Sequence, residues 1–372
     1  MRQRTVVQLL PALHAGGVER STLEIARALV QQGHRAVVVS AGGRLVPALL
    51  ASGAEHITLD IGRKSLLTLR HLPALRRLFA ELGADIVHAR SRLPAWLGWK
   101  AIQAMPAGQR PAWVTTVHGL NSPSRYSRIM TSGERVICVS ETVSAYVRRH
   151  YPDVPSDRLR VIPRGVDLSD FARRPRPDRV SRRAVGKRHP ALAGDGPLLL
   201  LPGRGTRLKG HADALALLAA LRAGGIPAVL WMPGAVENDR QAYLDELMTL
   251  AGTLGVADAV VASPATDRIA EAYAASDLVL QLSSKPEAFG RTVIEALAVG
   301  APVVGWDHGG VGELLQQLQP AGAVPMGDAA ALLAATQAQL SSPGHAPGRI
   351  PFTLQSMQSA TLDVYAELLA SR

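Results

Sequence analysis

The chain of 372 residues is poor in cysteine and in aromatic side chains, and each scarcity narrows its function. Cys138 is the only cysteine, which excludes a disulfide framework and any zinc or iron–sulfur site built from several cysteines. No apolar run reaches 18 residues without a charge, so no membrane-spanning helix is predicted. No Gly-x-Gly-x-x-Gly loop opens either half of the chain, which disfavours a nicotinamide dehydrogenase. These absences indicate an ordinary globular protein of a reducing compartment.

The basic residues are unevenly distributed along the chain. Residues 1–170 carry a net charge of +11, residues 171–190 carry +7, and residues 191–372 carry −7. Only 5 of the 41 basic residues are lysines, and a GC-rich genome would favour arginine in this way. Codon usage would act on both halves alike, so it does not explain the asymmetry. The N-terminal half is therefore expected to meet an anionic partner or surface.

Short β-branched segments alternate with amphipathic helical segments along most of the chain. Residues 6–10 are typical of a strand and residues 18–32 of a helix that Gly33 ends; the alternation restarts at residues 198–201. Such alternation predicts parallel βαβ units, and hence an α/β fold with two Rossmann-like, doubly wound domains. Ligands of open sheets bind at the carboxyl ends of the strands, so we expect the two domains to face a central cleft.

The composition also predicts where the domains end. Residues 171–190 hold seven arginines and three prolines, which is typical of a charged connector rather than a core element. We therefore expect an N-terminal Rossmann-like domain over residues 1–170, a basic linker over residues 171–190 and a C-terminal Rossmann-like domain over residues 191–350. A C-terminal helix at residues 351–372 is expected to pack back on the N-terminal domain.

The N-terminal segment is similar to a short secretory signal, because Arg2 and Arg4 precede an apolar stretch over residues 5–13. That stretch contains Gln8 and Pro11, so a buried first strand explains it better.

Two segments with glycines and cations follow predicted strands. Gly16 and Gly17 lie between the first strand and the first helix, where backbone N–H groups can approach a phosphate. The segment Gly203-Arg-Gly-Thr-Arg-Leu-Lys-Gly210 follows the first strand of the second half and contains Arg204 and Lys209. A guanidinium and an ammonium suit a diphosphate. The alternative is that both segments are turns, the second of them basic and solvated.

Two glutamates bracket the start of a predicted helix. Glu287 lies in the preceding loop, and Glu295 lies within the first two turns. The backbone N–H groups of Ala288, Phe289 and Gly290 are expected to be free at this helix start. Carboxylates can accept hydrogen bonds from vicinal sugar hydroxyls, while the N–H groups and the helix dipole face phosphate. Glutamates also favour helix N-termini for structural reasons alone.

A histidine also follows a predicted strand. His118 ends the strand expected over residues 113–117, at a carboxyl edge. A lone histidine in such a place is more often structural than functional, so the residue by itself assigns no role.

The order of these segments resembles one known family. The stretch from Pro286 to Leu297 resembles the Glu-x7-Glu signature of retaining glycosyltransferases of family 4, whose architecture of two Rossmann domains is called GT-B. Arg164 stands where the family usually has asparagine, and the resemblance spans about residues 5–340. The other segments that agree in order and spacing are Gly16-Gly-Val-Glu19, residues 161–167, residues 203–210 and Gly309-Gly-Val-Gly-Glu313.

The resemblance implies a role for each matching residue. Arg204 and Lys209 hold the diphosphate of the donor and stabilise the charge of the leaving group. Glu287 contacts the transferred hexose, and Glu295 binds the ribose hydroxyls. His118 lies by the hexose near the reacting carbon. The other donor-binding positions that the resemblance implies are Gly16, Gly17, Ser263, Pro264, Ala288, Phe289 and Gly290, with the base stacked on residues 262–265.

The resemblance also implies how the reaction proceeds. Cleavage of a glycosyl–phosphate bond develops positive charge on the sugar and negative charge on the diphosphate, so fixed cations stabilise the transition state. No cofactor and no metal is expected, since GT-B enzymes can act without one and the sequence has no Asp-x-Asp. Retention in the family is usually assigned to front-face attack, with the leaving phosphate taking the proton of the acceptor.

The expected partners are a nucleotide-sugar donor (UDP- or GDP-sugar) and an anionic glycolipid or glycan acceptor. One further segment is similar to family members that are connected with lipopolysaccharide and surface-polysaccharide assembly. It is His88-Ala-Arg-Ser-Arg92, followed by Leu93-Pro-Ala-Trp96. The resemblance thus implies hexose transfer to lipopolysaccharide core or a lipid-linked polysaccharide precursor. Each basic residue near an anionic leaflet contributes about 1 kcal/mol of electrostatic attraction to membrane binding. We therefore expect a cytoplasmic protein that is held peripherally on the inner face of the cytoplasmic membrane. An expected helix over residues 66–82 is the first candidate contact.

Two alternatives remain open at this point. A nucleotide-sugar epimerase or phosphorylase-like protein of the same fold would need no separate acceptor. A basic nucleic-acid-binding protein would explain the pI near 10.4, but aromatic residues are only 4% of the chain and no nucleic-acid-binding motif is present.

Overall fold

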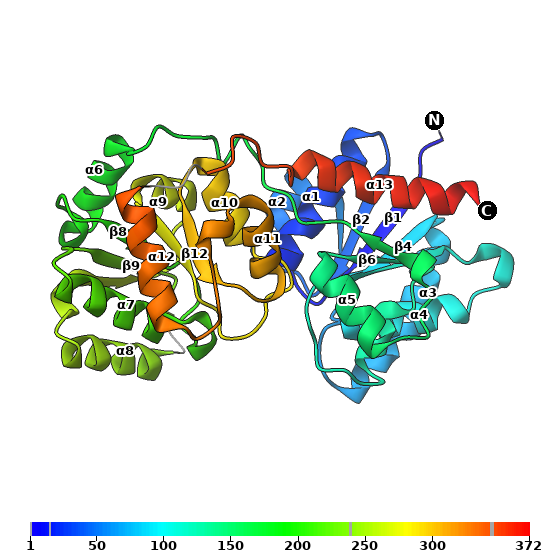
Figure 1. Cartoon of the computed structure of the whole chain (residues 1–372). Coiled ribbons are helices and arrows are strands. Elements are labelled where there is room, and N and C mark those ends of the chain that lie inside the picture. The colour runs from blue at the N-terminus through cyan, green and yellow to red at the C-terminus, as the bar shows by residue number, and fades with distance from the viewer. Residues whose placement is uncertain (1, 15, 238–239, 343–345) are drawn as a thin grey trace. The chain divides into compact units, whose positions relative to one another are not determined.

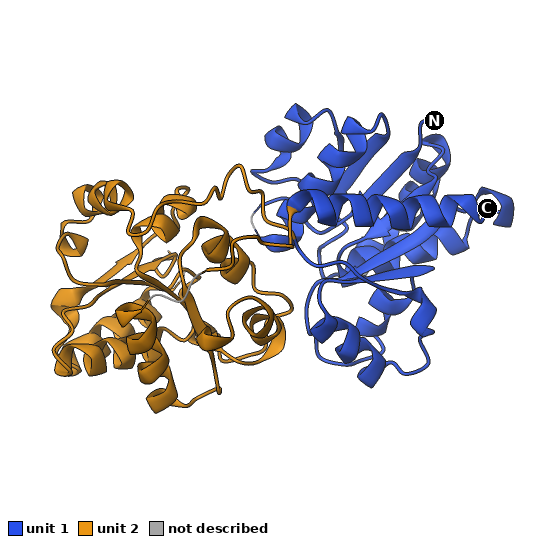
Figure 2. Cartoon of the chain, turned by 45° about the horizontal axis from the view of Figure 1, so that its top comes forward, with its two compact units in different colours: residues 1–164, 354–372 blue, residues 165–353 orange. Residues whose placement is uncertain are grey.

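The computed structural model describes residues 2–14, 16–237, 240–342 and 346–372. The chain forms two compact units, shown in different colours in Figure 2. Unit 1 comprises Met1–Arg164 and Leu354–Arg372, and unit 2 comprises Gly165–Thr353. Unit 1 carries a net charge of +12 and unit 2 a net charge of −1, so the basic surplus belongs to unit 1.

Unit 1 is built on a seven-stranded sheet in the order β3-β2-β1-β4-β5-β6-β7, in which all neighbouring strands are parallel. The central strands are apolar because helices cover both faces of the sheet. The strands are β1 (Thr5–Leu9), β2 (Arg35–Ser40), β3 (Glu55–Thr58), β4 (Ile86–Ala89), β5 (Ala112–Val117), β6 (Arg135–Cys138) and β7 (Leu159–Val161). The helices are α1 (Gly17–Gln31), α2 (Val46–Ala51), α3 (Leu72–Glu81), α4 (Arg92–Gln103), α5 (Glu141–His150) and α13 (Leu354–Ala370).

Helix α13 belongs to unit 1 although it lies at the far end of the chain. It packs beside α1, as Figure 1 shows, and Gln358 Nε2 donates to the Glu24 carbonyl oxygen at 2.8 Å. The Tyr365 hydroxyl lies 2.6 Å from His88 Nδ1 in the interior of the unit. The core of unit 1 therefore contains side chains from both ends of the chain.

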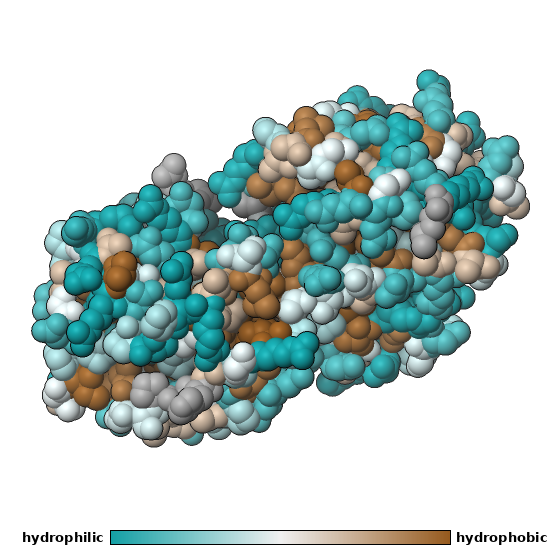
Figure 3. Space-filling model, turned by 90° about the horizontal axis from the view of Figure 1, so that it is seen from above, coloured by the Kyte–Doolittle hydropathy of each residue, from teal (hydrophilic) through white to brown (hydrophobic). Residues whose placement is uncertain are grey.

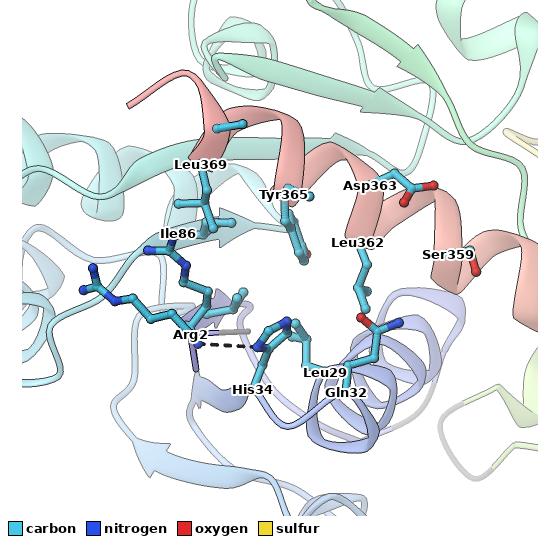
Figure 4. Close-up of a pocket in the computed structure, with 14 residues that line it drawn as sticks. Arg2, Leu29, Gln32, His34, Ile86, Ser359, Leu362, Asp363, Tyr365 and Leu369 are labelled. Carbon is cyan, nitrogen blue, oxygen red and sulfur yellow. Dashed lines mark hydrogen bonds between the residues drawn. The ribbon is translucent and has the colours of Figure 1, made fainter.

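A pocket of about 490 Å³ lies between α13 and the start of the sheet (Figure 4). Leu362 and Tyr365 reach from α13 toward Leu29 and His34. Ile86, the first residue of β4, also lines the pocket, which places it at the amino ends of the strands. Ligand sites of parallel sheets lie at the opposite edge, so this pocket is not the predicted active site.

Unit 2 is built on a six-stranded parallel sheet in the order β10-β9-β8-β11-β12-β13. Together with unit 1, this confirms the predicted α/β fold of two Rossmann-like domains. The strands are β8 (Leu198–Leu200), β9 (Val229–Pro233), β10 (Val260–Ser263), β11 (Leu278–Gln281), β12 (Val303–Trp306) and β13 (Ala323–Val324). The helices are α6 (Arg179–Arg188), α7 (His211–Ala223), α8 (Gln241–Thr253), α9 (Ile269–Ala275), α10 (Arg291–Val299), α11 (Gly309–Leu318) and α12 (Ala329–Ser341).

The expectation that residues 171–190 form a connector without core structure is wrong for the second half of that stretch. Asp178 Oδ1 accepts hydrogen bonds from the backbone N–H groups of Val180 at 3.0 Å and Ser181 at 2.9 Å, and so caps α6. Ser181 and Val185 are buried, and the helix packs against α9 within unit 2. The many arginines of the segment obscured this short apolar face in the sequence.

The arginines of the same stretch have partners inside unit 2. The Arg176 guanidinium donates to backbone carbonyls at the end of α9, including that of Ala274 at 2.8 Å. Arg188 pairs with Glu271 of α9. These cations therefore stabilise the packing of unit 2 rather than adding to the basic surplus of unit 1.

The helix expected over residues 66–82 is two helices. Leu66–His71 forms a 3-10 helix, η1, and α3 follows with Pro73 in its first turn. Proline has no backbone N–H and favours the first helical positions, so it starts a new helix rather than continuing the old one. Leu67 and Leu69 of η1 are exposed at 70% and 53%.

Hydrophilic side chains cover most of the face of the molecule in Figure 3, with apolar side chains in smaller patches between them. Within the described residues, no helix combines the length and the hydropathy that crossing a bilayer would require.

Candidate functional site

A polar cluster of unit 2 surrounds Glu287, in the loop between β11 and α10. Its Oε1 atom accepts hydrogen bonds from Lys209 Nζ at 2.5 Å and from Ser283 Oγ at 2.6 Å. Gln281 Nε2, at the end of β11, lies 3.4 Å from Oε2. The side chains of Lys209 and Glu287 are 29% and 24% exposed, so the pair is ordered but open to a ligand.

Lys209 reaches Glu287 because the two loops follow neighbouring strands. β8 pairs with β11 in the sheet, so the loops at their carboxyl ends meet at the same edge. Gly210, which follows Lys209, has a φ of +74°, and a Cβ atom there would lie 2.1 Å from the Leu282 carbonyl oxygen. Only glycine fits this close, left-handed turn, which sets Lys209 beside the loop after β11.

Arg204 lies in the same loop as Lys209 but is differently placed. Its side chain is exposed, and it makes no hydrogen bond or ion pair with the residues that the structure describes. The two predicted cations therefore differ: Lys209 is held by a carboxylate, and Arg204 is available to an anionic ligand.

The start of α10 is shaped by its neighbour α11. Gly290 precedes α10 with a φ of +105°, and Phe289 is buried with its ring 6.0 Å from that of Phe352. The Gly310 N–H donates to the Glu287 carbonyl oxygen at 2.7 Å, and a Cβ atom on Gly310 would lie 2.5 Å from Phe289 Cα. The glycine pair at residues 309–310, predicted only as a family match, thus supports residues 287–290 through close backbone packing.

Glu295 lies in a different environment from Glu287. It is 7% exposed, and the Tyr273 hydroxyl of α9 donates to its Oε2 atom at 3.1 Å. Arg291, one turn earlier in α10, approaches Oε1 at 3.8 Å. Of the two glutamates in the sequence pattern, Glu287 therefore has a partly exposed carboxylate and Glu295 a buried one.

Ser263 and Pro264 lie at the carboxyl end of β10, on the same edge of the sheet. Trp231 Nε1 donates to Ser263 Oγ at 3.0 Å, and the Gly234 N–H donates to the Ser263 carbonyl oxygen at 2.9 Å, so Ser263 is engaged within the protein. Pro264 is exposed. β10 lies two strand positions from β8, which is about 10 Å at the usual strand spacing.

His118 follows β5 in unit 1 and is held by a residue that sequence reasoning had noted only as a departure from the family. Arg164 Nη2 donates to His118 Nδ1 at 2.5 Å. Burial, and then the charges of Arg164, Arg90 and His88, hold the pKa of His118 well below its usual value, so the ring is neutral. Because Nδ1 accepts, the ring proton is on Nε2, which makes no hydrogen bond to the described residues.

A buried polar network underlies His118. Arg90 follows β4 and donates to Gln8 Oε1 at 2.8 Å and to Ser21 Oγ at 2.9 Å. Arg164 donates to the same hydroxyl at 3.0 Å. Sequence reasoning missed the role of Gln8, Ser21 and Arg90, because nothing local shows that residues so far apart in the chain converge.

Gly16 and Gly17 lie exposed at the start of α1, above the carboxyl end of β1. Gly16 has a φ of +139°, and among the described residues no atom beyond the adjoining backbone lies within 4 Å of a Cβ position on Gly17. A Cβ atom on Gly16 would lie 2.6 Å from Glu19 Oε2, so the carboxylate of Glu19 in the first turn lies beside this helix start.

The structure therefore brings Lys209 and Glu287 together beside the start of α10 at one edge of unit 2, and Arg204 lies in the same loop as Lys209. Ser263 and Pro264 lie along that same edge, and Glu295 is buried behind it. His118, Gly16 and Gly17 belong to unit 1 and lie at the carboxyl edge of its own sheet. Gln281 and Ser283, which hold Glu287, were not predicted; their place at the end of a strand before a glutamate was the available signal.

Two family models match the chain over most of its length. Glycosyltransferase Family 4 matches residues 15–170, and Glycosyl transferases group 1 matches residues 185–347. The chain belongs to the GT-B glycosyltransferases of family 4. The match confirms the resemblance that rested on the Glu-x7-Glu segment and its companions.

Curated relatives of this GT-B chain are also glycosyltransferases by name, and each matches only part of its own length. A D-inositol 3-phosphate glycosyltransferase of Xylanimonas cellulosilytica is 31% identical over 61% of this chain and 56% of that protein. The chain thus spans about half the length of the curated relatives it matches. The acceptor in their name is an inositol phosphate, not the lipopolysaccharide that the sequence resemblance implied.

Solved structures share the whole architecture. A glycosyltransferase from Rickettsia africae is 26% identical over the full length of both chains, with a TM-score of 0.87. HepE from Anabaena, solved in complex with UDP and glucose, is 18% identical over 98% of this chain and 100% of that chain, with a TM-score of 0.81. At this low identity, the similarity to HepE shows only a shared fold.

Proposed function

We propose that this chain transfers a hexose from a nucleoside diphosphate sugar to an anionic acceptor, with retention of configuration. The observation that carries the proposal is the Lys209–Glu287 pair beside the start of α10. A cation in that place stabilises the diphosphate more as it leaves than while it is bonded to the sugar, and so lowers the barrier.

The donor is assigned along one edge of unit 2. Lys209 and Arg204 hold the diphosphate, and the backbone at Ala288, Phe289 and Gly290 supplies N–H donors to its oxygens. Glu287 accepts from hexose hydroxyls. Glu295, oriented by Tyr273, accepts from the ribose, and the base lies toward Ser263 and Pro264.

The proposed reaction uses no metal ion, because side-chain cations stabilise the negative charge of the leaving diphosphate. His118 is assigned as a hydrogen-bond donor to the hexose through Nε2–H, and not as a general base, since its accepting nitrogen is occupied by Arg164. The leaving phosphate takes the proton of the attacking acceptor hydroxyl on the front face of the sugar.

The acceptor is assigned to unit 1, whose net charge of +12 favours an anion. Two classes of acceptor fit this proposal. A lipopolysaccharide core or lipid-linked polysaccharide precursor follows from the sequence resemblance. An inositol phosphate is favoured by the names of the curated relatives.

The proposal includes peripheral contact with the cytoplasmic face of the inner membrane through η1 and α3. Leu67 and Leu69 are exposed apolar side chains, and Arg70, Arg76 and Arg77 are exposed on the same segment. Flotation with phosphatidylglycerol vesicles at low salt tests this contact. The double variant Leu67→Ser with Leu69→Ser should lose binding, while Leu254→Ser in unit 2 should not; absence of wild-type binding would refute the contact.

The proposed activity is tested by nucleoside diphosphate release from UDP-, GDP- and ADP-sugars, each with inositol 3-phosphate, with crude glycolipid, and without acceptor. HepE was solved with UDP and glucose, so UDP-glucose is the first donor to assay. Release that needs one donor and one acceptor, and that Glu287→Ala abolishes, supports the proposal. Donor turnover to an isomeric sugar without acceptor supports the epimerase alternative instead. No turnover and no thermal shift with any donor would refute both.

A further inference from the structure

The tryptophans of this chain are buried with two exceptions, and the two exceptions line the same pocket. Trp113, Trp231 and Trp306 are 4%, 2% and 3% exposed. Trp96 and Trp99 are partly exposed, and both line a pocket of about 360 Å³ on unit 1. Aromatic residues are only 4% of the sequence, so two adjacent, accessible indoles indicate a surface with a ligand.

The geometry of α4 fixes the two indoles side by side. Trp96 and Trp99 are three residues apart on one face of the helix, toward the 3-10 helix η3 (Ser127–Thr131). Trp96 Nε1 donates to the Tyr126 carbonyl oxygen at 3.0 Å, which holds its ring in place. The pocket therefore has a pre-ordered aromatic wall.

The rest of the pocket is cationic. Arg125, Arg128 and Arg158 line it, and of the described residues that line it Asp153 alone is acidic. Arg128 pairs with Asp153, so this guanidinium already has an acidic partner. Arg125 and Arg158 are exposed, and neither guanidinium makes a hydrogen bond or ion pair within the part of the chain that the structure describes. Two open guanidinium groups thus line the same pocket as the two indoles, and Lys100 Nζ adds a further cation over the Trp99 ring, 5.4 Å from its centroid.

We propose that Trp96, Trp99, Arg125 and Arg158 form a distal acceptor subsite that binds a sugar ring bearing a carboxylate or a phosphate. The flat apolar face of a pyranose stacks on an indole, and a guanidinium pairs with an attached anion through two parallel hydrogen bonds. The inference rests on the proposed function, because it takes unit 1 as the acceptor-binding unit. It narrows the acceptor to an anionic glycan longer than the sugar that receives the hexose.

A membrane surface is the competing explanation for exposed tryptophan and arginine. Membrane contacts use protruding side chains, such as Leu67 and Leu69 of η1, whereas Trp96 and Trp99 line a concavity. A volume of about 360 Å³ falls in the range of small-ligand pockets. The concave form therefore favours a sugar ring over a lipid surface.

The test uses the full chain and measures binding without the donor. Tri-galacturonate is the anionic probe and maltotriose its uncharged control, with binding followed by tryptophan fluorescence and by titration calorimetry. We expect tri-galacturonate to change the fluorescence and maltotriose to bind at least about ten-fold more weakly. Trp99→Ala and the pair Arg125→Gln with Arg158→Gln should each weaken binding at least about ten-fold, while Arg149→Gln, an exposed arginine of α5, should not.

Two results would overturn the inference. One is tri-galacturonate affinity that is equal in wild type, Trp99→Ala and the double arginine variant. The other is the absence of probe binding by the wild type; vesicle binding (phosphatidylglycerol and phosphatidylcholine) that these variants lose would then make the pocket a membrane contact. A thermal shift with UDP or GDP is measured in parallel. It reports on unit 2, so failure of the donor site and failure of this subsite are distinguished.

Discussion

Arg164 donates a hydrogen bond to His118 Nδ1, and this contact sets which nitrogen of the ring carries the proton. A guanidinium has no acceptor, so a neutral His118 must hold its proton on Nε2. The residue that departs from the usual asparagine of the family therefore turns His118 into an obligate hydrogen-bond donor toward any ligand at that edge of unit 1.

The first prediction concerns the protonation of His118. The ring should be the neutral Nε2–H tautomer and stay neutral as the pH falls through 6.5, because burial and then Arg164 hold its pKa well below that value. Arg164→Asn removes a positive charge and the Nδ1 donor, so the pKa should rise and both tautomers should appear. Histidine-detected nitrogen NMR measures both. An Nδ1–H signal for His118 in the wild type would contradict the assignment.

The second prediction concerns the cation beside Glu287. Lys209→Ala removes a charge placed to stabilise the leaving diphosphate, so kcat should fall by about 10²–10³-fold. Nucleoside diphosphate release measures the rate, and a nucleotide-induced thermal shift measures donor binding. Lys187→Ala, an exposed lysine of α6, is the matched control and should leave both unchanged. Full activity of Lys209→Ala would remove Lys209 from the mechanism.

The third prediction compares two glycines with similar backbone angles. Gly210 has a φ of +74° and Gly255 a φ of +69°. A Cβ on Gly210 would lie 2.1 Å from the Leu282 carbonyl oxygen, whereas a Cβ on Gly255 would meet no atom of the described residues within 4 Å beyond its chain neighbours. Gly255→Ala should cost only the left-handed strain, about 1–2 kcal/mol. Gly210→Ala should lower the free energy of unfolding further and weaken donor binding, because Lys209 moves. Equal losses in denaturant titrations would show that the loop accommodates the methyl group.

The fourth prediction uses Cys138 as a probe of unit 1. The side chain is buried at the end of β6, and burial raises the pKa of its thiol to about 12. Since the thiolate is the reactive form, a maleimide should label the native protein only when unit 1 opens. Mass spectrometry gives the labelling rate, with urea-denatured protein as the positive control. Labelling of the native protein as fast as of the denatured protein would contradict the burial.

The alternation of strands and helices was enough to predict two parallel α/β domains, because buried parallel strands and covering helices each leave a local pattern. The cluster of Lys209 and Glu287 was predictable for the same reason: each follows a strand, and strand ends share an edge. Their partners Gln281 and Ser283 were not predicted, because the only signal in the sequence is their place at the end of a strand before a glutamate.

The features that the sequence did not predict share a physical origin, because none of them leaves a clear local pattern. Helix α6 was missed because its apolar side is short and its arginines pair with residues of α9 far along the chain. The break between η1 and α3 depends on Pro73, which is compatible with a helix start as well as with a loop. The convergence of Arg90 and Arg164 on Ser21 depends on tertiary packing alone.

The return of α13 to unit 1 has a consequence for synthesis on the ribosome. Unit 2 is one continuous segment, Gly165–Thr353, and can fold as soon as it has emerged. The sheet of unit 1 is made before unit 2, yet Tyr365 and Leu368 of its core are made after unit 2. Until then the nascent first half exposes the apolar surface that α13 will cover. The unit whose sheet is translated before unit 2 is thus completed after it.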